Sequence, residues 1–521
     1  MKTFTKASTL LGLLILMLVA LPSLANEYQG TVSAGYVYTD IEGNQGVHQP
    51  TYNLYEGAAL SLERFRYQWD SGLLLTANIT NITLNNRHIN LGFSKPGHAG
   101  INVQHSAYMR TYSFDGADFT RRRSTSGSAW FKPIRQLKIF GGYGVTDKHG
   151  RMPDLFEPAG GSGLNFVDYT HSFYNIGAEF KHERSYGRLE YFISDFCDDL
   201  SRTNDRSSRR IKFSAFSPIP RYERVVVNFG YQHYEQDIEY RYDTLTANTF
   251  WGGARYAHPL GYHVQYTFMF DRARRTGDLT DADKIVNAIY VGKTWRGRGG
   301  VTAGYGHLIN DDVLVARAGD QYSLSGWVEA IENLRLRGGI SYRTNEVDSG
   351  RTLTGDIDYA RHFISAKYRF GLHTVRVKIE DRHRSNDDIG TDVDFMRAST
   401  DIFVSDPRYG DLSLSYSIGD GSYEQAEGLF DYTEHVLSGD LLSREYRKFQ
   451  GGIGGVYYRA KQDVDVESFT LRFTGRYRVH PRAQLEIVYS AHNFDNFYDV
   501  SRYYSEYYTA NVVEFRVNFE L

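Results

Sequence analysis

Apolar and polar residues alternate along the C-terminal end of the chain. The odd positions are apolar and the even positions carry charged or amide side chains: Val513, Phe515, Val517, Phe519 and Leu521 alternate with Glu514, Arg516, Asn518 and Glu520. Because successive side chains of a β-strand point to opposite faces, this pattern predicts a strand with one apolar face and one ionic face.

The same alternation recurs upstream. In four further segments, apolar residues alternate with polar or charged ones. The apolar and polar sets are Phe469, Leu471, Phe473, Tyr477 and Val479 with Arg472, Arg476 and Arg478; Leu334, Leu336, Ile340 and Tyr342 with Arg335, Arg337 and Arg343; Val375, Val377 and Ile379 with Arg376, Lys378 and Glu380; and Tyr262, Val264, Tyr266, Phe268 and Phe270 with His263, Gln265, Thr267 and Asp271. Each segment is therefore predicted to be a strand with one apolar face.

Turn signals separate such segments at a nearly constant interval. The predicted turns are Lys95-Pro96-Gly97, Lys132-Pro133-Ile134, Ser217-Pro218-Ile219-Pro220, His258-Pro259-Leu260, Arg296-Gly297-Arg298, Ile331-Glu332-Asn333, Phe370-Gly371-Leu372, Pro407-Arg408-Tyr409 and His480-Pro481-Arg482. From Pro259, the steps to Gly297, Asn333, Gly371, Tyr409 and Pro481 are 38, 36, 38, 38 and 72 residues, and the last step holds a further turn near Glu445. A period of this size fits two long strands, a short turn and a longer loop.

These elements predict an all-β fold, a single large antiparallel up-and-down transmembrane β-barrel of about 26 strands, within a range of roughly 22 to 28. A soluble sandwich would also alternate, so further features are needed to decide. Lys2 and Lys6 precede an apolar run from Leu10 to Leu21, and small residues follow, so residues 1–25 are expected to be a secretory signal peptide. The mean hydropathy of −0.47 excludes a helical membrane protein and permits a barrel with polar loops and a polar lumen.

Aromatic residues and prolines also favour a membrane barrel. The chain has Tyr 41, Phe 31 and Trp 5, together 15% of its residues, which suits aromatic girdles at the two membrane interfaces. Trp69, Trp130, Trp295 and Trp327 lie near predicted turns, where they would mark the belt at one edge of the membrane. Outside the signal peptide, every proline falls in a predicted turn or loop, as a closed sheet in lipid requires.

Residues 26–521 are predicted to be one barrel domain. The longer polar segments, expected to be outer loops, are 41–57, 114–127, 146–169, 272–283, 418–430 and 493–507, and the short turns and both termini would face the periplasm. Alternation begins near Tyr28, so any plug in the lumen must be a loop or a partner protein.

The residues give no indication of an enzyme or of a cofactor of the chain's own. Cys197 is the single cysteine, so neither an intrachain disulfide nor a Cys-x-x-Cys-His haem attachment site is possible. The glycine-rich segments 160–163 and 451–455 lack the spacing or context of catalytic or phosphate-binding loops. Asp278, Asp281 and Asp283 are interpreted as a solvated acidic loop, with a calcium site as the alternative. Lys+Arg 59 against Asp+Glu 62 gives no reason to expect nucleic acid as a partner.

The polar faces of the predicted strands supply the candidate lumen residues, which are Arg335, Arg337, Arg343, Arg376, Lys378, Arg472, Arg476, Arg478, Arg516, Glu486, Glu514, His263 and His492. Glu380 and Glu520 share this face, so a mixed, salt-bridged wall is expected, and an anion-attracting stripe is the functional alternative. The two histidines are interpreted as polar lining residues, with a contact to the metal or haem of a guest protein as the alternative. The candidate lipid-facing residues are Val513, Phe515, Val517, Phe519 and Leu521.

The signal peptide, the hairpin meander and the last strand, which ends Val517-Asn518-Phe519-Glu520-Leu521, resemble those of Gram-negative outer-membrane porins, whose last strand guides assembly. That family usually ends in Phe, and Leu521 is a conservative departure. The high strand number, the short turns and the missing plug are most similar to the MtrB/PioB-type barrels of porin–cytochrome electron conduits.

The resemblance implies a place in the outer membrane, contact with its lipid, and two alternative functions. As a sheath, the barrel would hold a periplasmic multihaem c-type cytochrome for extracellular electron transfer, with haem present only in that partner. As a diffusion porin, it would pass small hydrophilic or anionic solutes through an open lumen.

Overall fold

The computed structural model describes residues 27–45, 55–112, 118–153, 164–238, 240, 243–276, 281–312, 316–347, 356–386, 390–425, 428–496 and 507–521. The predicted signal peptide, residues 1–25, lies outside the described residues. In the described part of the chain, no helix has the length and apolar character needed to cross a membrane.

The described residues form 26 strands and a short 3-10 helix, η2 (Arg202–Asn204). The strands are β1 (Glu27–Gly43), β2 (Gly57–Gln68), β3 (Leu74–Thr80), β4 (His88–Lys95), β5 (Ala99–Thr111), β6 (Phe119–Ile134), β7 (Leu137–Pro153), β8 (Leu164–His182), β9 (Ser185–Asp198), β10 (Arg206–Ile219), β11 (Tyr222–Ile238), β12 (Asp243–Ala257), β13 (Tyr262–Arg275), β14 (Ala282–Trp295), β15 (Gly299–Asp312), β16 (Ala316–Ile331), β17 (Leu334–Val347), β18 (Ile357–Phe370), β19 (His373–Asn386), β20 (Thr391–Asp406), β21 (Gly410–Gln425), β22 (Gly428–Ser443), β23 (Phe449–Gln462), β24 (Val466–His480), β25 (Ala483–Asn496) and β26 (Tyr508–Glu520).

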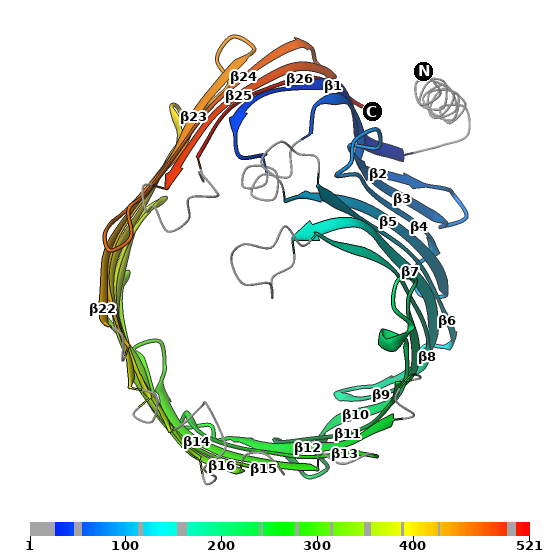
Figure 1. Ribbon diagram of the computed structural model, residues 1–521, viewed down its shortest axis with the longest axis vertical. Coiled ribbons are helices and arrows are strands. Elements are labelled where there is room, and N and C mark those ends of the chain that lie inside the picture. Colours follow the sequence, from blue (N-terminus) through cyan, green and yellow to red (C-terminus); the bar gives the residue numbers. More distant parts are fainter. Residues whose placement is uncertain are drawn as a thin grey trace.

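The strands close into a barrel. Each strand pairs antiparallel with the next one along the chain, and β26 pairs with β1, where Tyr36 lies opposite Phe515. Figure 1 shows the resulting ring, with β26 beside β1. Closure pairs the first strand with the last, as a sheet in lipid requires. The predicted fold class and the predicted number of 26 strands are both confirmed.

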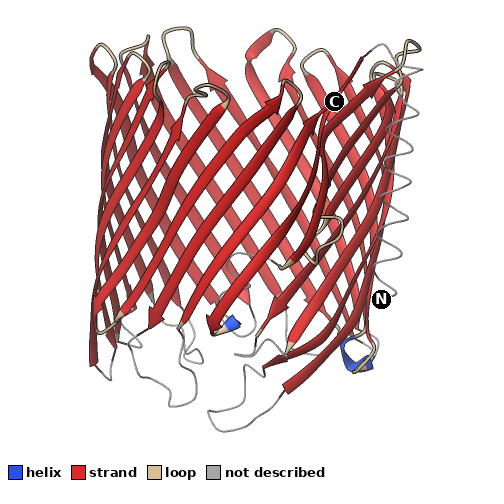
Figure 2. Ribbon diagram, turned by 90° about the horizontal axis from the view of Figure 1, so that it is seen from above, coloured by secondary structure: helices blue, strands red, loops and turns tan. Residues whose placement is uncertain are grey.

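Except for β3 and β4, which have 7 and 8 residues, the strands are long enough to cross a bilayer. Each strand from β12 to β25 has 14 to 16 residues, and Figure 2 shows that the strands are tilted against the barrel axis. At about 3.3 Å per residue and a tilt of about 40°, such a strand rises roughly 35 Å. That height exceeds the apolar band of about 25 Å that outer-membrane barrels present to lipid.

Tight turns gather at one rim, at the top of Figure 2, which we call the turn rim; the opposite rim is the loop rim. β1 begins at the turn rim, since Glu27 lies opposite Gln68 at the end of β2, and the C-terminus lies there as well. Consecutive strands end and begin at the predicted turns 95–97, 258–260, 296–298, 331–333, 370–372, 407–409 and 480–482 and near Glu445. These turn predictions are confirmed.

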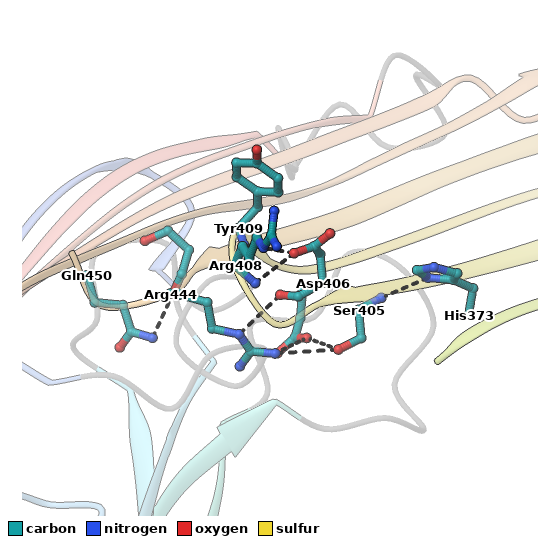
Figure 3. A network of polar contacts seen from close by, with 9 residues as sticks. His373, Ser405, Asp406, Arg408, Tyr409, Arg444 and Gln450 are labelled. Atoms are coloured by element: carbon teal, nitrogen blue, oxygen red, sulfur yellow. Dashed lines mark hydrogen bonds and ion pairs between the residues drawn. The ribbon is translucent and has the colours of Figure 1, made fainter. Parts of the chain in front are cut away.

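The turn between β20 and β21 shows how a polar network holds such a turn (Figure 3). The Asp406 carboxylate accepts hydrogen bonds from the backbone N–H groups of Arg408, at 2.7 Å, and Tyr409, at 3.2 Å. Arg444, from the next turn, donates to the Asp411 carboxylate at 3.0 Å. Neighbouring turns of the rim are thereby cross-linked through side chains.

Two predicted turns are displaced by the strands that precede them. β6 continues through Pro133 to Ile134 and β10 through Pro218 to Ile219. The ladder register shifts at both places, and a proline can be accommodated at such an irregular strand end because no regular ladder bond is lost. Pro153, which was expected in a loop, is the last residue of β7.

The strands also extend into every segment predicted to be an outer loop. The clearest corrections are 114–127, where β6 begins at Phe119, and 418–430, where β21 reaches Gln425 and β22 begins at Gly428. The strand bounds likewise shorten the loops predicted at 41–57, 146–169, 272–283 and 493–507. The sequence hides these strand ends because both of their faces are polar, whereas backbone pairing does not depend on an apolar face.

An apolar cluster seals the junction of the first and last strands. Its buried core is Leu62, Phe65, Tyr67, Ala77 and Ile79, and Val32 and Leu521 pack against it. The Leu521 N–H donates to the Gly30 carbonyl at 3.0 Å. The C-terminal residue is therefore fixed into the closure of the barrel by both packing and a backbone hydrogen bond.

Candidate functional site

The register divides the barrel wall into two faces, because directly opposed residues of paired strands lie on the same side of a sheet. Arg476 lies opposite Glu486, which lies opposite Arg516. We call the face that carries these residues the polar face, and the face that carries Phe515 the apolar face.

Following the register around the barrel places every candidate lumen residue on the polar face. They are Arg335, Arg337 and Arg343 in β17, Arg376 and Lys378 in β19, Arg472, Arg476 and Arg478 in β24, Glu486 and His492 in β25, Glu514 and Arg516 in β26, and His263 in β13. The candidate lipid-facing residues Val513, Phe515, Val517 and Phe519 alternate with them, and Leu521 packs with Val32 on the apolar side. That the polar face lines the lumen stays a prediction at this point.

The apolar face is largely an exposed hydrophobic surface. Phe515, Val517 and Phe519 are 42%, 39% and 45% exposed, and large apolar residues of most other strands are exposed in the same way, whereas those of β2 and β3 are buried in the cluster at the barrel closure. Tyrosines lie on this face, and some donate hydroxyl hydrogen bonds to polar neighbours, such as Tyr305 to Asp320 at 2.8 Å and Tyr342 to Asp358 at 2.9 Å. A continuous apolar surface with tyrosine hydroxyls turned to polar groups suits a lipid boundary.

The four tryptophans predicted to form one belt do not lie on one face of the wall. Trp327 lies opposite Arg337, and Trp130 lies opposite Gly100, so both belong to the polar face. Trp295 is exposed on the apolar face, and Trp69 packs against the apolar cluster at the barrel closure. Nearness to a turn does not settle which way a side chain points, since the face changes with every residue.

From β22 to β26 the polar face is a salt-bridged surface, as predicted. Its ion pairs are Arg472 with Asp440 at 2.7 Å, Arg476 with Glu486 at 2.7 Å, Arg478 with Glu445 at 2.7 Å and Arg516 with Glu514 at 2.6 Å. Positive and negative groups are nearly balanced in this sector, so it presents little net field to the space in front of it.

From β17 to β20 the polar face is strongly basic instead. Its cationic residues are Arg335, Arg337, Arg343, Arg361, Lys367, Arg369, Arg376, Lys378, Arg382, Arg384 and Arg397, and the acidic residues on the same face of these described strands are Glu380 and Asp401. We call this sector the cationic stripe. The anion-attracting alternative therefore describes this part of the wall better than the mixed wall does.

Sequence reasoning found part of the stripe and missed β18, which supplies Arg361, Lys367 and Arg369. In β18 the alternation is masked, because Phe363 lies on the polar face and His362 on the apolar face. A period-2 search that tolerates one exchange between faces would have found this strand.

Glu380 is the focus of the stripe. It is only 4% exposed, and its carboxylate lies 2.8 Å from Arg361 Nε and 2.6 Å from Arg382 Nε and also contacts Lys378. Burying a carboxylate is costly, and these three cations offset that cost. Arg397, opposite Glu380, is paired with Glu434 of β22 instead.

Several cations of the stripe rest on aromatic rings rather than on acids. The Arg335 guanidinium carbon lies 4.3 Å from the Trp327 ring centre, and the Arg337 carbon lies 5.7 Å from that of Phe363. Among the described residues, no carboxylate forms an ion pair with Arg335, Arg337, Arg343 or Arg376. Stacking on a ring holds a guanidinium in place while its N–H edge stays available to an anion.

The histidines and acidic residues raised as metal ligands are held by neighbouring side chains. His492 is buried beside the Thr470 hydroxyl at 3.2 Å, and His263 lies 3.4 Å from that of Thr302. Asp281 and Asp283 lie near arginines, at 3.6 and 2.9 Å, while Asp278 and the glycines 160–163 lie outside the described residues.

One group with metal-ligand chemistry escaped the sequence analysis. His383, Asp392 and Asp394 bring their ligand atoms within 4.8 Å of one another. They lie on the apolar face toward the loop rim, and the distances from His383 Nδ1 are 3.3 Å to Asp392 and 2.7 Å to Asp394. The glycine-rich segment 451–455 is part of β23, which confirms its interpretation as ordinary strand.

The sequence matches no protein-family model and no curated protein. Among solved structures, the chain is similar to the siderophore receptor PirA from Acinetobacter baumannii, with a TM-score of 0.53 and 7% identity over 95% of this chain and 81% of that chain. It is also similar to a chain of the FpvAI–pyocin S2 complex, with a TM-score of 0.50 and 8% identity over 95% of this chain and 73% of that one. At such identities the likeness concerns the fold alone. The chain has the fold of an outer-membrane β-barrel.

Proposed function

We propose that this protein is a conduit through the outer membrane of a Gram-negative bacterium, and that its barrel sheathes a periplasmic multihaem c-type cytochrome that carries electrons across. The observation that carries the proposal is the closed ring of 26 strands. With strands about 4.8 Å apart and tilted by about 40°, the backbone circle is roughly 50 Å across. Side chains reduce this width by roughly 10 Å, which still leaves room for a small folded protein.

In this proposal the polar face lines the lumen and the apolar face meets lipid. The support is chemical and geometric. Phe515 and Val517 are exposed, as side chains that diverge on the convex side of a curved wall would be, whereas Arg516 and Glu514 are half-buried, as on a crowded concave side. Lipid would leave the many charges of the polar face unsolvated, whereas water in a lumen would solvate them.

The cationic stripe would be the docking wall for the guest. A guest with an acidic surface would be attracted by the unpaired arginines of β17 and β19, and the salt-bridged sector from β22 to β26 would add little to that attraction. The haem groups would belong to the guest, and the barrel would insulate and position them without chemistry of its own.

A passive diffusion porin is the second candidate, and the same stripe favours it. Without a guest, a lumen of this width would be filled with water, and its excess of arginine and lysine would favour small anions over cations.

Purification of the tagged barrel from native outer membranes tests the choice. The sheath hypothesis expects a haem-stained periplasmic protein to co-purify, and expects the complex to transfer electrons across liposomes while the barrel alone does not. The triple variant Arg335→Gln, Arg337→Gln, Arg343→Gln should retain much less of the haem protein. The control, Arg476→Gln with Glu486→Gln, removes one charge of each sign and should retain it.

Isolation without any haem protein, together with permeability of intact cells to small anions, would select the diffusion porin. Recovery of the barrel in the soluble periplasmic fraction would contradict both candidates.

A further inference from the structure

A basic cluster lies on the apolar face near the loop rim and has no role in the conduit. Arg87, in the segment between β3 and β4, donates from Nε to His105 Nε2 of β5 at 3.3 Å. The Arg87 carbonyl accepts the N–H of Ala107 at 2.9 Å, and Ala107 lies opposite Arg123 of β6. Arg87 and Arg123 therefore flank the same residue of β5.

Arg121 completes the cluster. It lies opposite Met109 of β5 and donates a long contact of 4.0 Å to the Met109 sulfur. The backbone at Met109 is fixed in turn, since the Tyr55 hydroxyl donates to its carbonyl. The backbone that carries this cluster is therefore fixed by a side-chain hydrogen bond in addition to the hydrogen bonds between strands.

The positive charge of the cluster is not neutralised. Among the described residues, no carboxylate forms an ion pair with Arg87, Arg121 or Arg123. Asp147 lies opposite Arg123 in β7, and its carboxylate contacts His149, at 3.8 Å. Burial and the charges of Arg123 and Arg121 lower the pKa of the Arg87 guanidinium, as expected for like charges brought together.

The cluster also contains hydrogen-bond donors without an acceptor. The Nε atoms of Arg121 and Arg123 are buried and have no hydrogen-bond partner within the described part of the chain. Buried charged donors without partners are rare in folded proteins, because each costs free energy that an acceptor would recover. An anion that belongs to another molecule would neutralise the charge of the cluster.

The position of the cluster along the barrel axis indicates which kind of molecule this is. On the same face of β5 and β6, Ile101, Val103 and Phe131 are exposed nearer the turn rim. At about 3.3 Å per residue and a tilt of about 40°, Ala107 lies roughly 20 Å from the level of Ala99 at the turn rim, in the direction of the loop rim. The arginines therefore lie near the loop-rim edge of an apolar band about 25 Å tall, where lipid headgroups begin.

We propose that Arg87, Arg121 and Arg123 bind the phosphorylated headgroup of a lipid in the leaflet at the loop rim. A phosphate offers several acceptor oxygens to converging guanidinium groups, and the acyl chains of the lipid would cover Ile101 and Val103 on the side toward the turn rim. The site rests on the apolar face meeting lipid and is independent of what the lumen contains.

The test is lipid binding by the purified full-length barrel, with bisphosphorylated lipid A in detergent micelles as the probe and native mass spectrometry as the readout. The triple variant Arg87→Gln, Arg121→Gln, Arg123→Gln should bind roughly a hundredfold more weakly, at about fivefold per arginine. Lipid A without its phosphates should bind the unaltered barrel as weakly, and inorganic phosphate at millimolar concentration should not displace bound lipid A.

The matched control is Arg110→Gln, Arg122→Gln, Lys148→Gln, which removes three cations from the polar face of the same hairpins. It should bind lipid A as the unaltered barrel does. Equal binding by both triple variants, loss of binding in the control alone, or displacement by inorganic phosphate would overturn the proposal. Heat-dependent gel mobility verifies folding, and Arg123→Gln alone, expected to weaken binding about fivefold, decides the matter if the triple variant does not fold.

Discussion

Arg472 and Asp440 form an ion pair of 2.7 Å although a whole strand lies between them. In the ladder, Asp440 of β22 lies opposite Gly454 of β23, and Gly454 lies opposite Arg472 of β24. A Cβ atom at Gly454 would stand 2.1 Å from the Asp440 Oδ1 atom. The pair exists because glycine leaves open the space through which the two side chains meet.

We predict that Gly454→Ala uncouples this pair. The Asp440 side chain would have to rotate away, so a double-mutant cycle of Asp440→Ala and Arg472→Ala should give a coupling of about 0.5 kcal/mol in the unaltered barrel and about zero in the Gly454→Ala background. Urea unfolding of the barrel in lipid vesicles measures both cycles. The control is Gly306→Ala on the same face, where a Cβ would be 3.6 Å from its nearest neighbours; a lost coupling there would disprove the steric explanation.

The assignment of faces predicts unequal effects from adjacent residues. Phe515→Arg places a charge on the proposed lipid side and should destabilise the inserted barrel by about 2 to 4 kcal/mol if Phe515 is near the midplane. Arg516→Ala removes a polar-face partner of Glu514 and should cost about 1 kcal/mol. Folding into vesicles measures the two variants, and equal costs would show that the faces are assigned in the wrong sense.

Glu380 should matter more for stability than its single charge suggests. Glu380→Gln leaves Arg361, Lys378 and Arg382 without their shared carboxylate and should destabilise the barrel by about 3 kcal/mol. Glu514→Gln, which affects only the pair with Arg516 at 2.6 Å, should cost about 1 kcal/mol. Denaturant midpoints compare the variants, and a smaller effect at Glu380 than at Glu514 would contradict its central role in the stripe.

The cationic stripe predicts the ion selectivity of the barrel without a guest. In planar bilayers under a potassium chloride gradient, the purified barrel should favour chloride, since unpaired arginines face the proposed lumen. Arg335→Gln, Arg337→Gln and Arg343→Gln together should move the reversal potential toward zero. The joint change Arg476→Gln and Glu486→Gln leaves the net charge unchanged and should leave the potential where it was. Cation selectivity in the unaltered barrel would exclude a lumen lined by the stripe.

The sequence alone determined the architecture and which candidate residues share a face of the wall. Strict period-2 alternation, as at Val513 to Leu521, fixes the face of every residue once a strand is recognised, and the regular turn spacing fixes the number of hairpins. These signals are local, so they can be interpreted without knowing which strands are neighbours.

The alternation pattern could not locate the ends of the strands. In the stretch that begins β6, from Phe119 to Thr125, polar residues occupy both faces, and the sequence therefore reads as a loop. Pairing with β5 and β7 makes it a strand, because backbone hydrogen bonds do not depend on an apolar face. The prediction for Trp130 and Trp327 used their nearness to a turn. The face of a side chain is set instead by its position in the strand, so that prediction did not identify their face.

Only the tertiary structure decided how charges are distributed around the wall. The sequence shows arginines in β17 and in β24 alike, yet those of β24 meet carboxylates from β22 and β25, whereas Arg337 and its neighbours meet aromatic rings. Whether a charge is neutralised depends on partners that are distant in the sequence, such as Asp440 for Arg472, which are 32 residues apart. Alternation carries no information about cross-strand partners, because register and closure are properties of the whole barrel.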